Sequence, residues 1–321
     1  MAPRRPVLPA LGVGMALVAL VALAASRAAD APGEATGSRA VAFTIDDLPA
    51  SRSGSLADMR RVNAGLLRAF KAEGIPAIGF VNEVKLAITG EEAAREQLLS
   101  DWLDAGHELG NHGYRHIRFY DASLEAMEAD VLDGERVTRR LLAARGRTPR
   151  WFRHPTLSTG RDSASRAAFE SFLAAHGYAV APVTMDSDEW IYAAAYDRAR
   201  ARGDHALRDR IGRDYLRYMD EVTGFHERLA RKLFGRDIAH TLLLHANALN
   251  AEYVDDLAAM FRRRGYRFVP LAEALADDAY RSPDTYVGPK GLSWLQRWQI
   301  SRGEPTGEQP QAPDWVQAAM K

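Results

Sequence analysis

Two adjacent acidic residues, Asp46 and Asp47, end a short apolar run near the start of the chain. Two histidines, His112 and His116, stand four residues apart further along. One carboxylate and two imidazoles suit zinc, with coordination positions left for water. Because a strand directs successive side chains to opposite faces, both aspartates reach one site only if the strand ends there and the chain turns. The proline that follows supplies such a break. The sequence therefore predicts a metal site with a spare carboxylate.

The histidine pair needs a local structure that brings both rings together. A four-residue spacing places two side chains on one face when the segment is helical, and residues 106–111 before the pair indicate a strand-to-loop transition that would deliver both histidines to the end of a strand. Two histidines and one carboxylate also describe a non-haem iron oxygenase, so these residues alone do not fix the reaction. Asp46, together with His245 at the end of a later apolar run, offers a base and an acid, and hydrolysis uses both.

Composition limits the classes of protein to consider. The 321 residues are 47% hydrophobic, enough for a substantial core, and lysine plus arginine equals aspartate plus glutamate at 42 each. A formal net charge of +0 gives no electrostatic reason to expect a nucleic-acid partner. The absence of cysteine excludes thiolate ligands, cysteine nucleophiles and disulfides.

The first thirty residues differ from the rest of the chain. A basic start is followed by an apolar and small-residue run from Leu11 to Ala25, which is typical of a secretory signal. We expect a signal peptide over residues 1–30, a linker over 31–38, and an exported protein, periplasmic or extracellular. The apolar run is short for a membrane span, so no stable membrane insertion is expected after cleavage, with an uncleaved anchor as the alternative.

The remaining sequence alternates apolar, strand-like runs with helical patterns, which predicts parallel strands joined by helices. The count of about seven units favours an α/β fold, a distorted (β/α) barrel. We expect a catalytic domain over 39–279 with a helical insertion at about 191–235, one long helix over 123–144, and a C-terminal tail over 280–321. In parallel barrels the functional groups follow the strand ends. The residues at such positions are Asp46, His112, Arg153, Asp186 and His245.

Five short motifs resemble those of the polysaccharide deacetylases with a NodB-homology domain, carbohydrate esterase family 4. In order, they are Thr44-Ile45-Asp46-Asp47, His112-Gly113-Tyr114-Arg115-His116, Arg153-His154-Pro155, Asp186-Ser187-Asp188-Glu189-Trp190 and Leu242-Leu243-Leu244-His245. The sequence departs from the family pattern at Gly113, which we expect to loosen the metal loop, and at Glu189, which replaces an aspartate.

The resemblance implies a role for each matching residue. Asp47, His112 and His116 would bind a divalent metal, most simply Zn²⁺, with Co²⁺, Ni²⁺ or Mn²⁺ as alternatives. Asp46 would be the general base and His245 the general acid as a water activated by the metal attacks an acetyl carbonyl. Arg153 would orient Asp46, and Asp186 would keep His245 protonated. A backbone N–H near Thr156 would stabilise the oxyanion, and Trp190 would contact the sugar.

The leading hypothesis is therefore a metal-dependent carbohydrate deacetylase acting on an acetylated oligo- or polysaccharide. The substrate would be a polymer that contains N-acetylglucosamine or an acetylated, xylan-type glycan. Two alternatives stay open at this stage: a catalytically silent glycan-binding protein on the same barrel, and the iron oxygenase. Asp46 and His245 argue against the silent protein, because binding alone requires neither a base nor an acid.

Overall fold

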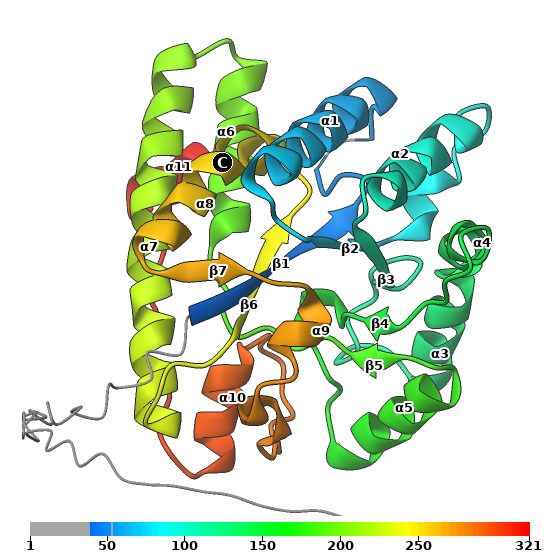
Figure 1. The fold of residues 1–321 in the computed structure, drawn as a ribbon, viewed down its shortest axis with the longest axis vertical. Helices are drawn as coiled ribbons and strands as arrows, with labels where there is room; N and C mark the ends of the chain where they lie inside the picture. Colours follow the sequence, from blue (N-terminus) through cyan, green and yellow to red (C-terminus); the bar gives the residue numbers. More distant parts are fainter. Residues whose placement is uncertain (1–38, 53) are drawn as a thin grey trace, which may run out of the picture. The chain divides into compact units, whose positions relative to one another are not determined.

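The structure is a computed structural model that describes residues 39–52 and 54–321. The predicted signal peptide and linker lie outside the described residues. A parallel sheet of seven strands forms the centre, in the order β5-β4-β3-β2-β1-β6, with β7 also paired to β1 (Figure 1). The strands are β1 (Arg39–Leu48), β2 (Ile78–Val81), β3 (Glu108–Asn111), β4 (Trp151–Phe152), β5 (Ala179–Val180), β6 (His240–His245) and β7 (Tyr266–Phe268).

The sheet curls back on itself. Just past β5, Met185 forms a parallel bridge with Leu242 of β6, so the two ends of the strand order are linked. This confirms the expected α/β fold, a distorted (β/α) barrel of seven strands.

Helices cover the outside of the sheet and follow its strands in sequence (Figure 1). The strands β1, β2 and β6 are buried along almost their whole length, so their sequences are mostly apolar rather than alternating. The helices are α1 (Leu56–Glu73), α2 (Glu92–Asp104), α3 (Leu124–Asp133), α4 (Arg136–Ala143), α5 (Ser163–Ala175), α6 (Glu189–Ala201), α7 (His205–Phe234), α8 (Ala248–Arg263), α9 (Leu271–Ala274), α10 (Trp294–Ser301) and α11 (Asp314–Ala319), with 3₁₀ turns at Glu83–Leu86, Pro155–Leu157 and Asp278–Arg281.

The alternation along β1 decides which side chains face the interior of the barrel. Val41, Phe43 and Ile45 belong to the large core between sheet and helices. The residues between them face the other way: Ala40 and Ala42 join a smaller inner cluster, and Thr44 and Asp46 are buried further along the same face. On the inner face of β1, alanines therefore occupy the amino-terminal part of the strand, and the polar residues Thr44 and Asp46 lie toward its carboxyl end.

One predicted helix is interrupted. Instead of a single helix over 123–144, the chain forms α3 and α4 with a break at Gly134. The Glu83 carboxylate accepts hydrogen bonds from the backbone N–H groups of Val137 and Thr138, at 2.9 and 2.7 Å, and so caps α4 separately. A methyl group at Gly134 would lie 2.6 Å from backbone atoms of Gly113 and Tyr114. The break therefore lets the loop that carries the histidine pair pack against the end of α3.

The stretch predicted as a helical insertion forms α6 and α7, an antiparallel pair beside α8 (Figure 1). Its tyrosines Tyr192, Tyr196 and Tyr215 are buried and extend the main core. The C-terminal residues also pack on the fold, since Trp294 and Trp298 of α10 are 5% and 1% exposed. Within the part of the chain that the structure describes, no helix is both long and apolar enough to cross a membrane.

Candidate active site

A bulge in β1 brings both aspartates to one site. The pairing of β1 with β2 shifts register between Ile45 and Leu48, and Asp47 adopts a left-handed backbone with φ 71°. Asp46 stays in register beside His245 of β6. β1 ends at Leu48, directly before Pro49, where the sequence indicated a break, and the extra residue of the bulge redirects Asp47 just before that end.

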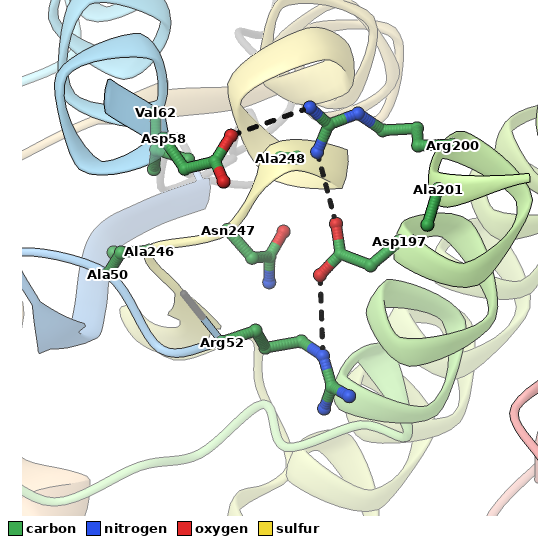
Figure 2. Close-up of a pocket in the computed structure, with 10 residues that line it drawn as sticks. All are labelled: Ala50, Arg52, Asp58, Val62, Asp197, Arg200, Ala201, Ala246, Asn247 and Ala248. Carbon is green, nitrogen blue, oxygen red and sulfur yellow. Dashed lines mark hydrogen bonds and ion pairs between the residues drawn. The ribbon is translucent and has the colours of Figure 1, made fainter. Parts of the chain in front are cut away.

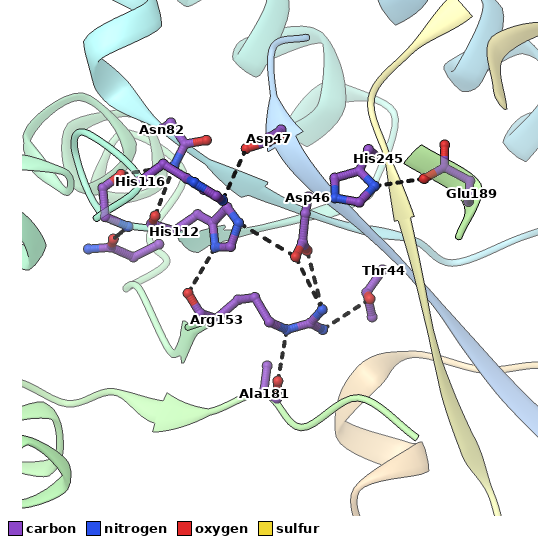
Figure 3. Close-up of polar contacts among 12 residues, drawn as sticks. Thr44, Asp46, Asp47, Asn82, His112, His116, Arg153, Ala181, Glu189 and His245 are labelled. Carbon is purple, nitrogen blue, oxygen red and sulfur yellow. Dashed lines mark hydrogen bonds and ion pairs between the residues drawn. The ribbon is translucent and has the colours of Figure 1, made fainter. Parts of the chain in front are cut away.

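Asp47, His112 and His116 form the expected cluster of metal donors. One ligand atom from each lies within 4.8 Å of the other two. The Nε2 atom of His116 is 3.8 Å from Asp47 Oδ1, and the Nδ1 atom of His112 lies 2.8 Å from the carbonyl oxygen of Arg153 (Figure 3). A carbonyl on the far ring nitrogen fixes the orientation of a histidine ligand. Burial lowers the pKa of both histidines, most strongly for His112, which favours the neutral form that binds metal.

The two histidines meet through a loop and not through a helix. Residues 112–119 contain no helix, and His116 has φ 62°. Gly113, expected to loosen this loop, instead permits its tight path. Its φ is 73°, and a Cβ there would lie 2.3 Å from Asp130 Oδ2. The loop is further held by Asp130, whose backbone carbonyl accepts from Tyr114 N–H at 2.9 Å and whose carboxylate accepts from Arg115 N–H at 3.0 Å.

Asp46 is buried and held by Arg153. The Nη1 atom of Arg153 lies 3.3 and 3.4 Å from the two carboxylate oxygens, and its Nη2 atom donates to Thr44 Oγ1 at 3.0 Å (Figure 3). Arg153 is itself fully buried, with its Nε donating to Ala181 O at 2.8 Å. Burial raises the pKa of Asp46 to about 6, although the charges of Arg153 and His245 oppose this. Asp46 also lies 3.5 Å from His112 Nε2, next to the metal donors.

Lys85 is a charged neighbour of Asp47 that the sequence did not single out. Its Nζ donates to the backbone carbonyl of Asp47 at 3.0 Å and lies 3.3 Å from the carboxylate. Burial alone would raise the pKa of Asp47, but Lys85 and the neighbouring histidines hold it below its usual range. The position of Lys85 could have indicated this contact. Lys85 follows β2, which pairs in parallel with β1, so the carboxyl ends of the two strands lie at the same edge of the sheet.

His245 is paired with Glu189, which corrects the role expected for Asp186. The Nδ1 atom of His245 donates to Glu189 Oε2 at 2.7 Å (Figure 3). Burial alone would lower the pKa of His245, but the Glu189 charge and hydrogen bond raise it to about 9. Asp186 instead accepts a hydrogen bond from the backbone N–H of Ser187 at 2.9 Å, and burial raises its pKa to about 6.

Glu189 is satisfied on both oxygens. Its Oε1 accepts from the amides of Asn247 and Asn250 at 2.5 and 2.7 Å, and Tyr215 OH donates to Asn250 at 2.7 Å. Glu189 is 1% exposed. A buried, fully hydrogen-bonded carboxylate at the start of α6 therefore keeps the imidazole of His245 charged and fixed in orientation.

One cavity of about 310 Å³ brings the predicted residues together. Its lining includes both aspartates, His112, His116 and His245, and also Asp186, Thr156 and Trp190. Arg153 lies beneath Asp46 and orients it without lining the cavity. Trp190 is 48% exposed, so a large apolar surface is available at the rim. Gly291, from the C-terminal region, also lines the cavity and was not predicted.

Several residues that line this cavity have strained, left-handed backbone conformations. In the described residues, left-handed φ values outside glycine occur at Asp47, His116, Thr156 and Leu157. All four line the cavity. Such conformations cost of order 1–3 kcal/mol each and persist only where surrounding contacts hold them, which is typical of functional sites.

A second hollow, of about 320 Å³, lies between α1, α6 and α8 (Figure 2). Its charged side chains pair with one another: Arg52 with Asp197 at 3.4 Å, and Arg200 with Asp197 at 3.2 Å and Asp58 at 3.9 Å. These four charges sum to zero, and the metal-donor cluster, Asp46 and His245 line the other cavity. This hollow offers no comparable chemistry.

Residues 33–172 match the family model described as polysaccharide deacetylase. No curated protein sequence matches the chain. The family 4 carbohydrate esterase from Streptomyces lividans, solved in complex with acetate, is 20% identical over 74% of this chain and 95% of its own, with a TM-score of 0.47.

Two further solved structures resemble the chain to the same degree. The family 4 acetyl xylan esterase from Clostridium thermocellum, in complex with cobalt, is 18% identical over 74% of this chain and 92% of its own, with a TM-score of 0.47. A CE4 family pseudoenzyme from Bacillus anthracis is 17% identical over 74% of this chain and 66% of its own, with a TM-score of 0.48.

The family match covers β1 to the last turn of α5, and therefore includes Asp46, Asp47, both metal-donor histidines and Arg153. Beyond the end of this match, β6 places His245 beside Asp46 of β1. Residues 33–172, less than half of the chain, thus match the polysaccharide deacetylase family, and the curled parallel sheet agrees with the distorted (β/α) barrel that this match implies.

Proposed function

We propose that this protein is a metal-dependent hydrolase that removes acetyl groups from an acetylated carbohydrate. One observation carries the proposal: a carboxylate outside the metal-donor cluster, Asp46, and a charged imidazole, His245, open into the same cavity as Asp47, His112 and His116. Hydrolysis of an acetyl group needs a base for the attacking water and an acid for the departing sugar atom.

The donor set fits a divalent cation. Two neutral histidines, one of them oriented by a backbone carbonyl, and one ionised carboxylate suit Zn²⁺, with Co²⁺, Ni²⁺ and Mn²⁺ as alternatives. When bound by these three residues, such a cation supplies Lewis acidity that polarises the acetyl carbonyl and acidifies water.

Each remaining residue has a task that follows from its surroundings. Asp46 accepts the proton of the attacking water, and Arg153 keeps its carboxylate oriented through Nη1. His245 donates a proton to the departing sugar nitrogen or oxygen, and Glu189 keeps that proton available by holding the imidazolium. A backbone N–H in the left-handed turn at Thr156 donates to the developing oxyanion.

The substrate is proposed to be an acetylated glycan that the exported protein meets outside the cytoplasm. The exposed ring of Trp190 beside the cavity offers a stacking surface for a sugar. The predicted signal peptide at the start of the chain supports action outside the cytoplasm, on an N-acetylglucosamine polymer or an acetylated xylan.

The experiment is a panel assay for released acetate. Mature protein with added zinc or cobalt is incubated with chitin oligomers, peptidoglycan fragments, acetylated xylan and a small acetyl ester, with a chelator-treated sample as control. We expect acetate release that depends on metal. Binding of a glycan without release would favour the silent glycan-binding protein, and turnover that requires iron and oxygen would favour the oxygenase.

A further inference from the structure

The C-terminal residues, which lie beyond the family match, contact the strained turn beside the cavity. Thr156 and Leu157 both have left-handed backbones, with φ 54° and 53°. Neither residue is glycine, so this conformation needs support from the surrounding structure.

Arg297 of α10 provides that support. Its Nη2 donates to the carbonyl oxygen of Leu157 at 2.5 Å, and its Nη1 donates to Thr159 Oγ1 at 3.1 Å. Arg297 is 0% exposed, and its Nη1 also lies 3.2 Å from the Asp284 carboxylate. The guanidinium therefore ties both the strained residue and the end of the turn to one buried ion pair.

The guanidinium is fixed from the C-terminal side as well. Its Nε donates to Leu292 O at 3.1 Å, and its Cζ atom lies 4.1 Å from the ring centre of Trp294. The backbone N–H of Trp294 donates to the carbonyl oxygen of Val183, just beyond β5, at 2.6 Å. Asp284 also pairs with Arg166 of α5 at 3.0 Å. Side chains from α5 and α10 thus hold Arg297 in a single position.

The backbone at Gly291 approaches the same turn directly. A Cβ on Gly291 would lie 2.1 Å from the carbonyl oxygen of Thr156, and Gly291 lines the catalytic cavity. Its φ lies outside the left-handed region, so the close approach to Thr156, and not backbone strain, is what requires glycine here.

We propose that the C-terminal segment 284–297 completes the active site, with Arg297 as the positioning residue for the Thr156–Leu157 turn and Gly291 as part of the cavity wall. This inference rests on the proposed function, since the turn carries the oxyanion donor. The segment would then be an integral part of the catalytic domain. A domain boundary at residue 279, as expected from the sequence, would separate Gly291 and Arg297 from the rest of the site.

The test uses Gly291→Ala. Gly291 is exposed, and this substitution, unlike one at Arg297, removes no buried charge. The matched control is Gly307→Ala, also near the C-terminus, where a Cβ meets only an ordinary contact at 3.6 Å. We expect kcat for acetate release to fall about 10- to 100-fold in Gly291→Ala, as for a misplaced catalytic donor, with metal content unchanged. Gly307→Ala should match the wild type.

Arg297→Met and Arg297→Lys separate positioning from folding. We expect Arg297→Met to lower kcat by a similar factor and Arg297→Lys to restore part of it, because lysine keeps the charge beside Asp284. If Arg297→Met does not fold, Gly291→Ala decides. Wild-type kcat in Gly291→Ala, or a matching loss in Gly307→Ala, would overturn the proposal.

A measurement without substrate keeps this inference distinct from the proposed function. Hydrogen exchange of peptides covering residues 154–160 should quicken in Gly291→Ala and Arg297→Lys relative to wild type, while the peptide covering β1 stays unchanged. This result is expected whether or not the protein releases acetate. Unchanged exchange in both variants would overturn the positioning role even if the protein proves to be an active deacetylase.

Discussion

Glu189 accepts a hydrogen bond from His245 Nδ1 at 2.7 Å, across 56 residues of sequence. The carboxylate is 1% exposed and uses its other oxygen for two asparagine amides. The imidazole therefore carries its proton at neutral pH, with its pKa raised to about 9. This pair places a charged imidazole in the same cavity as the buried carboxylate of Asp46.

Glu189→Gln should lower the pKa of His245, because the neutral amide removes the charge that stabilises the imidazolium. Since an acid must be protonated to act, the alkaline limb of kcat/KM, expected near pH 9, should move down by about one unit or more. The measurement is a pH–rate profile. Asp186→Asn is the matched control, and a larger shift in that variant would restore the role first expected for Asp186.

The same pair links stability to pH. The folded-state pKa of His245 lies above its ordinary value of 6.5, so the stabilisation is complete below pH 6.5 and is lost as the pH rises through about 9. Up to about 3 kcal/mol of the free energy of unfolding is at stake. Urea unfolding at pH 6 and pH 9.5 measures the loss. The difference between the two pH values should shrink in Glu189→Gln, and an equal difference in both proteins would refute the linkage.

Arg153→Met should destabilise the fold by about 3–5 kcal/mol, because it leaves the buried carboxylate of Asp46 without its cation. Urea denaturation measures the effect. The matched control is Arg281→Met, whose partner Asp278 is exposed, and there the loss should be within about 1 kcal/mol. Similar losses of unfolding free energy in the two variants would show that the buried ion pair contributes no more to stability than the exposed one.

Gly134→Ala should disturb the metal loop, since the added methyl group meets backbone atoms of Gly113 and Tyr114 at 2.6 Å. We expect weaker metal binding by about tenfold, comparable to the loss of a group that orients a ligand. Titration of the metal-free protein with Zn²⁺ measures it. Gly54→Ala, where a Cβ has no neighbour within 4 Å, should bind as the wild type does. Equal affinities in all three proteins would contradict this account of the loop.

Much of the fold was predictable because buried parallel strands are apolar runs, as in Val41–Ile45 and His240–Leu244. Strand ends then placed Asp46, His112 and His245 together. The left-handed Asp47 was not predictable, because a bulge depends on pairing with a neighbouring strand.

Other features depend on contacts between distant segments. Gly134 breaks a helix because Glu83, some 50 residues earlier, caps the second half. Glu189 and Asp186 were both in the quoted motif, and only the start of α6 at Glu189 decides which one meets His245. Arg297 and Leu157 are 140 residues apart, and neither belongs to a recognisable motif.

The most direct test of the central claim compares acetate release and bound metal in the wild type and in Asp46→Asn. The account predicts that the wild type releases acetate in proportion to bound divalent metal, and that Asp46→Asn retains the metal on Asp47, His112 and His116 but loses turnover by about 100-fold or more, as expected when a general base is removed. Asp46→Asn that turns over at the wild-type rate, or that loses its metal, would contradict the separation of base from metal ligand.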